Sequence, residues 1–246
     1  MGREASVTGT IINAIAVLIG GLLGTLLGAR LPEKMRQTVM GAIGLVVLVV
    51  GFQMALSSQN ILIPMFSVLI GGVLGEWWRI EDGLNAFGRW LEDRTGHWFG
   101  EDERSVTRAF VTASLVFCVG PLTILGAIQD GLTGDYQLLA IKSLLDGFTS
   151  IAFAATLGPG VLLSIITILV YQGGIALLAM GFGSALGEVT RQTPWVLEMT
   201  AAGGILVLGI GLGLLELKRI RVGNLLPAVL IAPLLVALLH LLGITI

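Results

Sequence analysis

Long apolar runs that are almost free of charge dominate this chain of 246 residues. The chain has 30 charged residues, and 13 of them fall between Glu76 and Arg108, so the rest is nearly uncharged over long distances. Apolar residues make up 55% of the sequence, above the roughly 45–50% that is typical of soluble domains. Because water cannot be the main solvent of such runs, the sequence predicts a membrane protein that contacts the lipid bilayer.

The apolar runs have the length of membrane-spanning helices. A helix needs about 20 apolar residues to cross a hydrocarbon core of roughly 30 Å. Cutting the runs at charges and turn residues predicts an all-α polytopic bundle of about eight membrane helices, at residues 7–29, 38–56, 61–75, 106–128, 137–157, 160–182, 194–215 and 222–242. The third run is short, and the fourth contains Gly120–Pro121. We therefore expect either of these two runs to be re-entrant or strongly bent.

Positive charges predict the orientation of the chain, because Lys and Arg accumulate in cytoplasmic loops. With the N-terminus outside and eight crossings, 11 of the 14 Lys and Arg residues lie on the inner side. The outer side keeps only Arg3, Lys142 and Arg191. We therefore expect both termini outside.

Residues 80–104 form the main polar segment, with Ile80, Leu84, Phe87 and Leu91 at helical spacing and charges on the opposite face. Trp77, Trp78, Trp90 and Trp98 gather around it. Because indoles settle at the headgroup level, the pattern predicts an amphipathic helix on the cytoplasmic surface. The simplest interpretation of its acidic run and His97 is a solvated connector.

An internal repeat is visible at an offset of about 160 residues. Residues 24–28 match 183–187, residues 44–51 match 204–211, and residues 68–70 match 229–231. Five crossings separate the two copies, so they run in opposite directions across the membrane, as in many secondary transporters. The sequence thus predicts a first three-helix repeat (1–79), the cytoplasmic connector (80–104), a two-helix insert (105–158) and a second, inverted repeat (159–246).

The clearest polar feature within an apolar run is the pair Lys142 and Asp146, one helical turn apart. Ionisable groups inside a bilayer are costly and need a partner, a water-filled cavity or a function. Two interpretations stay open. The pair neutralises itself as a structural ion pair, with Lys142 reaching outward, or Asp146 faces a cavity and binds a proton, a cation or a cationic substrate.

Further polar residues extend the set of candidate solute- or ion-binding positions. Gln129 and Asp130 follow the Gly120–Pro121 break, and Ser143 lies beside Lys142. Asn13 and Gln172 occupy matching positions of the repeat at an offset of 159. Each has an equally simple structural interpretation: turn-capping for Asp130 and interhelical hydrogen bonding for the two amides.

Soluble-type chemistry has no counterpart in this sequence. There is no phosphate-binding loop and no dinucleotide-binding glycine pattern, and two histidines with one cysteine cannot form a transition-metal cluster. A net charge of −2 without a basic block argues against nucleic acid as a partner. We therefore expect no cofactor, no metal and no enzymatic activity.

Several short motifs carry a resemblance to a known family. They are Gly-Thr-Ile-Ile-Asn (9–13), Gly-Glu-Trp (75–77), Phe-Cys-Val-Gly-Pro (117–121), Gly-Ala-Ile-Gln-Asp-Gly (126–131) and Lys-Ser-Leu-Leu-Asp-Gly (142–147). Together they resemble the bacterial inner-membrane family of domain of unknown function 554, the YqgA/YdfK-like proteins, over essentially the whole chain. The resemblance implies a multi-pass protein of the bacterial inner membrane and supplies no substrate and no catalytic residue.

These features predict a secondary transporter or channel-like permease for a small polar or cationic solute, with coupling to protons or sodium. The alternatives are a non-transporting membrane scaffold that forms a homo-oligomer through glycine stripes such as Gly20, Gly24 and Gly28, and an intramembrane enzyme. A water-accessible path to Asp146 distinguishes transport from the scaffold.

Overall fold

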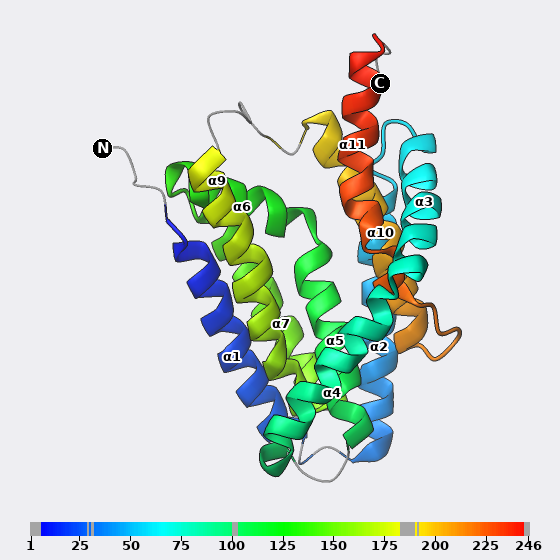
Figure 1. The fold of residues 1–246 in the computed structure, drawn as a ribbon. Coiled ribbons are helices and arrows are strands. Elements are labelled where there is room, and N and C mark those ends of the chain that lie inside the picture. Colours follow the sequence, from blue (N-terminus) through cyan, green and yellow to red (C-terminus); the bar gives the residue numbers. More distant parts are fainter. Residues whose placement is uncertain are drawn as a thin grey trace. The chain divides into compact units, whose positions relative to one another are not determined.

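The computed structural model describes residues 6–28, 30, 32–99, 103–182, 190 and 192–243. Over these residues the chain is helical, without strands, as expected for an all-α membrane protein (Figure 1). The chain forms two compact units that are built from interleaved segments. Unit 1 comprises residues 1–40, 85–118 and 122–189, and unit 2 comprises residues 41–84, 119–121 and 190–246.

Unit 1 is centred on α1 (Thr8–Gly28) and α7 (Gln137–Leu157). Its other elements are α5 (Glu103–Val119), α6 (Pro121–Thr133), η1 (Pro159–Leu163), α8 (Ser164–Thr167), η2 (Ile168–Gln172) and α9 (Gly173–Phe182). Unit 2 contains α3 (Leu62–Trp78), α10 (Pro194–Leu214), η4 (Val222–Leu225) and α11 (Pro227–Leu241). Two helices, α2 (Glu33–Ala55) and α4 (Ile80–Phe99), are divided between the units, and the last residue of α5 and the first residue of α6 also belong to unit 2.

The eight predicted runs are helical, and the two that were expected to be unusual, 61–75 and 106–128, differ from the other six. Among the described residues, six helical stretches are long and apolar enough to cross a membrane, and α3, with 17 residues, is shorter. The run 106–128 is two helices, α5 and α6, which are bent by 61° around the Gly120–Pro121 break and count as a seventh span if taken together. The run 160–182 is one continuous stretch of mixed 3-10, α and π geometry.

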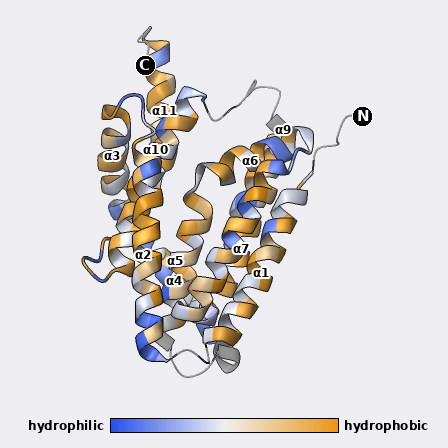
Figure 2. Cartoon of the chain, turned by 180° about the vertical axis from the view of Figure 1, so that it is seen from behind, coloured by the Kyte–Doolittle hydropathy of each residue, from blue (hydrophilic) through white to orange (hydrophobic). Residues whose placement is uncertain are grey.

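A glycine stripe brings α1 against α7 within unit 1, and the two helices lie side by side in Figures 1 and 2. A Cβ atom on Gly20, Gly24 or Gly28 would collide with a carbonyl oxygen of α7, at Gly147, Ile151 and Ala155 respectively. Since both series advance by four residues, the helices run parallel at very close range. The glycine stripe therefore serves contacts within the chain.

Unit 2 packs α2 against α10 and α3 against α11. Antiparallel close contacts join Gly51 to Leu208 and Gly44 to Leu215. At the end of α3, a Cβ on Gly75 would overlap the carbonyl oxygen of Asn224, so only glycine fits there. Small residues thus permit backbone contact in both units, as is usual for helix packing in membranes.

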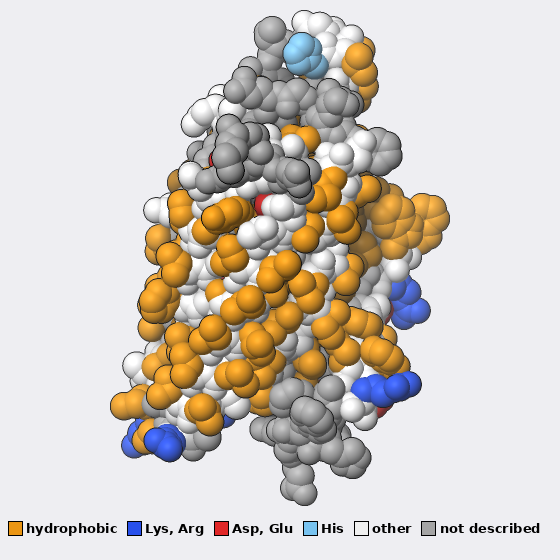
Figure 3. Space-filling model, turned by 90° about the vertical axis from the view of Figure 1, so that its left-hand side faces the viewer, with side chains coloured by type: hydrophobic (Ala, Val, Ile, Leu, Met, Phe, Trp, Pro, Cys, Tyr) orange, Lys and Arg blue, Asp and Glu red, His pale blue; other side chains and the backbone are white. Residues whose placement is uncertain are grey.

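Lipid-facing character is evident on the surfaces of the helices (Figure 2). The outer face of α1 exposes a row of large apolar side chains, namely Ile11, Ile15, Ile19, Leu22 and Leu26. On the face drawn in Figure 3, hydrophobic side chains are spread widely over the described residues. In water such a surface would aggregate, so the helices are built for a bilayer.

Candidate functional site

The predicted pair on α7 forms an ion pair. Lys142 and Asp146 lie one turn apart on the same helical face, and the Nζ atom of Lys142 contacts Oδ2 of Asp146. The two side chains are only 5% and 11% exposed. Because buried charges are stable only when they are paired and hydrogen-bonded, the surroundings of this pair decide what it can do.

Asn13 of α1 extends the pair across the glycine-lined contact. Its amide nitrogen donates to Oδ2 of Asp146 at 3.0 Å and to Oε1 of Gln172 at 3.0 Å. The amide of Gln172 in turn donates to the hydroxyl of Thr10 at 3.2 Å. We call these five residues, Thr10, Asn13, Lys142, Asp146 and Gln172, the polar network; all five belong to unit 1 and all are buried.

Gln172 reaches the network from an irregular helix. It ends the π-helical segment η2, between the short helix α8 and α9. π-helical turns inside α-helices are rare and occur often at functional sites. The π-helical segment therefore ends at Gln172, whose carboxamide joins the network.

One oxygen atom of the network is buried without a donor. Asn13 is 0% exposed, and its Oδ1 atom has no hydrogen-bond partner among the described residues. Both donors to Asp146 contact its Oδ2 atom, so no described residue donates to its Oδ1 atom. Buried acceptors without donors are costly and rare in folded proteins.

Three other predicted site residues have different partners. The carboxylate of Asp130 accepts the backbone N–H of Gly9 at 2.7 Å and the hydroxyl of Ser6 at 2.6 Å, so it caps the start of α1. The hydroxyl of Ser143 donates to the carbonyl of Leu139, in its own helix, at 2.6 Å. The hydroxyl of Thr133 donates to the backbone carbonyl of Gln129. These contacts are the ordinary capping and backbone roles of such residues.

Two residues near the ion pair were not predicted from the sequence. Thr10 precedes Asn13 by three residues, so it lies on the same face of α1, and this spacing was the available signal. Cys118, near the end of α5, is buried. Its neighbour Phe117 stacks on Phe153 of α7, with ring centroids 6.2 Å apart, so the end of α5 packs on the helix that carries the ion pair.

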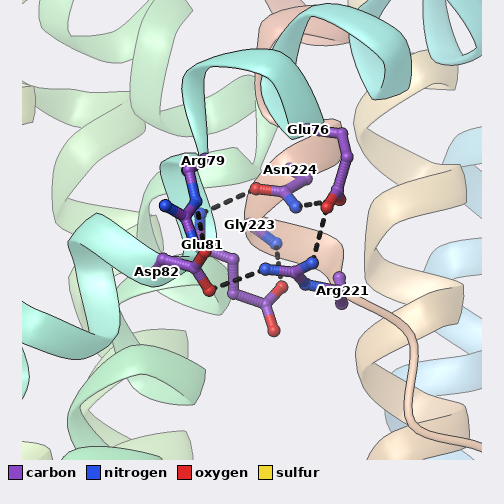
Figure 4. Close-up of polar contacts among 7 residues, drawn as sticks. All are labelled: Glu76, Arg79, Glu81, Asp82, Arg221, Gly223 and Asn224. Carbon is purple, nitrogen blue, oxygen red and sulfur yellow. Dashed lines mark hydrogen bonds and ion pairs between the residues drawn. The ribbon is translucent and has the colours of Figure 1, made fainter.

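Unit 2 contains a second charged cluster, which Figure 4 shows. The guanidinium group of Arg221 pairs with Glu76 and with Asp82, at 2.6 Å each. Asn224 donates to Glu76 at 2.5 Å and accepts the N–H of Glu81 at 2.8 Å. These contacts join the end of α3 and the start of α4 to η4.

The geometry of the α3–α4 junction explains this cluster. Arg79, between the helices, adopts a left-handed conformation with φ of 53°, which ends α3 and turns the chain. The carboxylate of Glu81 then accepts the N–H of Gly223 at 3.1 Å. Burial raises the pKa of Glu81, although the Gly223 hydrogen bond and Arg221 act in the opposite direction.

A buried carboxylate also caps the turn before α3. Glu198 of α10 is 0% exposed. It accepts the N–H groups of Gln59 and Asn60, at 2.8 and 3.1 Å, and the hydroxyl of Ser58 at 2.6 Å. Among the described residues no cation pairs with it, and these three donors explain how the carboxylate can be buried there.

The described residues contain no cluster of three or more His, Cys, Asp or Glu side chains arranged to hold a metal ion. A family model described as protein of unknown function (DUF554) matches residues 8–237. The chain belongs to the DUF554 family. The matched residues include parts of both units and every residue of the polar network.

Two relatives of the DUF554 chain extend over nearly its whole length. It is 34% identical over 227 residues to "Uncharacterized protein YqgA" from Escherichia coli (strain K12), covering 92% of this chain and 94% of that protein. It is 31% identical over 239 residues to "Uncharacterized membrane protein YdfK" from Bacillus subtilis (strain 168), covering 96% and 98%. No solved structure matches the chain. The family and its apolar helices identify a membrane protein.

Proposed function

We propose that this protein is a secondary transporter or channel-like permease of the bacterial inner membrane that moves a small polar or cationic solute. The observation that carries the proposal is the Lys142–Asp146 pair, buried within an apolar helix and hydrogen-bonded to Asn13 from another helix. Charged residues inside a membrane protein commonly mark ion or substrate pathways. In this proposal Asp146 binds the coupling ion or the cationic solute, and no residue has a catalytic role.

Contacts in unit 2 support the inverted repeat on which this proposal draws. At the offset of 160, Gly51 corresponds to Gly211 and Leu48 to Leu208. Gly51 contacts Leu208, and Gly211 contacts Leu48, so the two contacts exchange under the repeat. Such exchange is what a local two-fold relation between two copies produces.

A second pair of contacts follows the same rule. Gly44 approaches Leu215, and Gly204, the counterpart of Gly44, approaches Ala55, the counterpart of Leu215. Both sets of contacts run antiparallel, as copies with opposite membrane topology require. In unit 1 the hydrogen bond between Asn13 and Gln172 joins two counterparts directly. Inverted repeats around a central site are the common plan of secondary transporters.

The proposed orientation places both termini outside and Lys142 toward the outer leaflet, since α7 then begins at the outer surface. The insert, which carries the ion pair, supplies the charged groups that the repeat does not contain. The network would then be reached from the two sides in turn.

Reconstituted liposomes test the proposal. The full chain and the Asp146→Asn variant are placed in liposomes that contain a pH-sensitive dye, and sodium, potassium, ammonium and small amines are added outside in turn. The proposal predicts that at least one cation changes the internal pH or accumulates inside with the wild type and not with Asp146→Asn. A scaffold would give the same traces as empty liposomes with every compound.

Ser150→Ala is the matched control for the variant. Ser150 is a buried polar residue of the same helix, and its hydroxyl donates to the carbonyl of Val17 on α1. Its hydroxyl makes no hydrogen bond to Lys142 or Asp146 in the described structure. Transport that is lost in Ser150→Ala as severely as in Asp146→Asn would reflect disturbed packing between α1 and α7, and would contradict a specific role of the carboxylate.

A further inference from the structure

The polar network already holds one primary ammonium group, that of Lys142, on a buried carboxylate. In the same network, Oδ1 of Asn13 is buried without a donor among the described residues, and both donors to Asp146 contact Oδ2, which leaves its Oδ1 atom without a donor from a described residue. Asn13 is held in place by its two donated bonds, to Asp146 and Gln172, so its oxygen is fixed in orientation. An amide turned the other way would place its oxygen against the Asp146 carboxylate.

We propose that the polar network is a binding site for a small primary ammonium compound, R–NH3⁺, which exchanges with the ammonium of Lys142 on Asp146. The inference rests on the proposed function and names the chemical class of its solute. In the ligand-free protein Lys142 occupies the position of the ligand. When the ligand binds, its ammonium takes the place of the lysine ammonium on the carboxylate.

The number and charge of the oxygen atoms favour an ammonium ligand. A primary ammonium has three N–H donors and no acceptor. The network offers three acceptors: both oxygens of Asp146, once Lys142 has left, and Oδ1 of Asn13. With one carboxylate the site balances one positive charge. Divalent cations instead take about six to eight oxygen ligands, often from several carboxylates.

Lys142 has a route by which to leave. It lies one turn before Asp146, five residues after the start of α7 at Gln137. A lysine has a long flexible stem and can extend its ammonium along a helix toward the membrane surface. The ammonium can therefore move toward the start of α7 without a change in the backbone and without losing its proton. The exchange then needs no change in the net charge of the carboxylate site.

Equilibrium binding to the purified full chain in detergent micelles tests the inference. The probes are methylammonium and ethylammonium chloride, and the readout is the melting temperature, which a ligand of the folded state raises by mass action. Tetramethylammonium, which has no N–H donor, and sodium chloride at equal ionic strength are the control salts. The variants are Asp146→Asn, Lys142→Gln, Asn13→Ala and, as a control outside the network, Ser150→Ala.

We expect a saturable rise of the melting temperature with methylammonium in the wild type and in Ser150→Ala. Lys142→Gln removes the competing ammonium, so the affinity should increase at least tenfold. Asn13→Ala removes one acceptor and should weaken binding several-fold, and Asp146→Asn should abolish it. Asn13→Ala and Asp146→Asn keep the inference testable if Lys142→Gln does not fold.

Three results would overturn the inference. The first is a wild type that does not respond while Lys142→Gln does, because an ammonium would then only refill a structural ion pair. The second is an equal response to tetramethylammonium or sodium. The third is a response that Asp146→Asn retains.

The binding experiment is independent of flux. Binding without flux in liposomes would refute the transport function and leave the ligand class standing. Flux of another solute without ammonium binding would refute the ligand class and leave the transport function standing.

Discussion

The two charged clusters of this protein bind their helices together in different ways. In unit 1 the Lys142–Asp146 pair is 5% and 11% exposed, shares one helix and relies on amides from α1 and η2. In unit 2 Arg221 and its partners Glu76 and Asp82 are 46–57% exposed and join separate helical segments. The buried pair is held by partners within the protein, whereas the charged side chains of the Arg221 cluster are about half exposed and can also be hydrated.

Exposure decides which cluster is expected to matter energetically. Breaking a buried ion pair leaves an uncompensated charge in a medium of low polarity. An exposed pair loses little, because water and salt replace its partner. The following changes test this contrast, beginning with the largest expected effect.

Removing one charge of the buried pair should be the most damaging change. Lys142→Met leaves the Asp146 carboxylate buried without a cation, and we expect the free energy of unfolding to fall by about 3–5 kcal/mol. Denaturant titration in micelles, followed by the fluorescence of the five tryptophans, measures it. The double variant Lys142→Met/Asp146→Leu, which removes both charges, should recover most of the loss. Equal losses in the single and double variants would show that packing, and not charge, causes the effect.

Overpacking the contact that positions Asn13 should come next. Gly24→Ala places a methyl group against the carbonyl of Ile151, and we expect a loss of about 1–3 kcal/mol. Gly174→Ala in α9 is the matched control, because a Cβ there has open space; it should stabilise the helix by up to about 1 kcal/mol. The same titration compares them, and a Gly24→Ala variant as stable as Gly174→Ala would contradict the close approach of α1 and α7.

The cap of α1 should have a moderate effect. Asp130→Ala removes the acceptor of the Gly9 N–H and of the Ser6 hydroxyl, at a cost of about 1–2 kcal/mol. Asp130→Asn retains an acceptor oxygen and should lose less. Melting temperatures in micelles give the comparison. If Asp130→Asn loses transport while its stability is unchanged, Asp130 lines the solute path and is more than a helix cap.

The exposed cluster should respond weakly. Arg221→Gln removes both ion pairs to Glu76 and Asp82, yet we expect a loss of less than about 1 kcal/mol. Raising the salt concentration to about 1 M, where the Debye length falls to roughly 3 Å, should reduce the difference from the wild type further. The loss in Lys142→Met should not change with salt. A loss above that of Lys142→Met would reverse the comparison between the clusters.

The smallest effect concerns pH. Burial raises the pKa of Glu81 in the folded protein, so its folded form binds a proton more readily than its unfolded form. The contribution of Glu81 to stability is therefore present below its unfolded pKa and is lost as the pH rises through the raised value. Glu81→Gln should flatten this part of the curve of melting temperature against pH. A wild type whose stability instead falls on acidification through this range, and falls less in Glu81→Gln, would show the opposite sign.

The sequence predicted the helical class and most span boundaries because long apolar runs leave few alternatives in a bilayer. It placed Lys142 and Asp146 on one helix face, since residues four apart share a face, and left an ion pair as one of two interpretations. It also singled out Asn13 and Gln172, through the repeat. The sequence could not predict the hydrogen bond between Asn13 and Gln172, because this contact depends on the packing of α1 and on the π-helical geometry of η2.

Contacts between distant segments account for the remaining differences. For Asp130 the sequence left a capping role and a solute ligand open, and its capping contacts come from Ser6 and Gly9, which are more than 120 residues away in the sequence. The site of Glu198 depends on a turn at residues 58–60. The cluster around Arg221 depends on the left-handed conformation of Arg79, which a sequence pattern predicts only where glycine stands at such a position.

The 183–187 copy of the repeat lies outside the described residues.

The most direct test of the central claim, that water and solutes reach the buried ion pair, uses Cys118. It is the single cysteine of the chain, and its neighbour Phe117 stacks on Phe153 of α7, the helix that carries Lys142 and Asp146. A water-soluble methanethiosulfonate or maleimide reagent is applied to the folded protein in liposomes, with Cys118→Ala as the control. The account predicts labelling of the wild type at a rate that a bound ammonium compound changes. Labelling only after denaturation, with or without ligand, would contradict it.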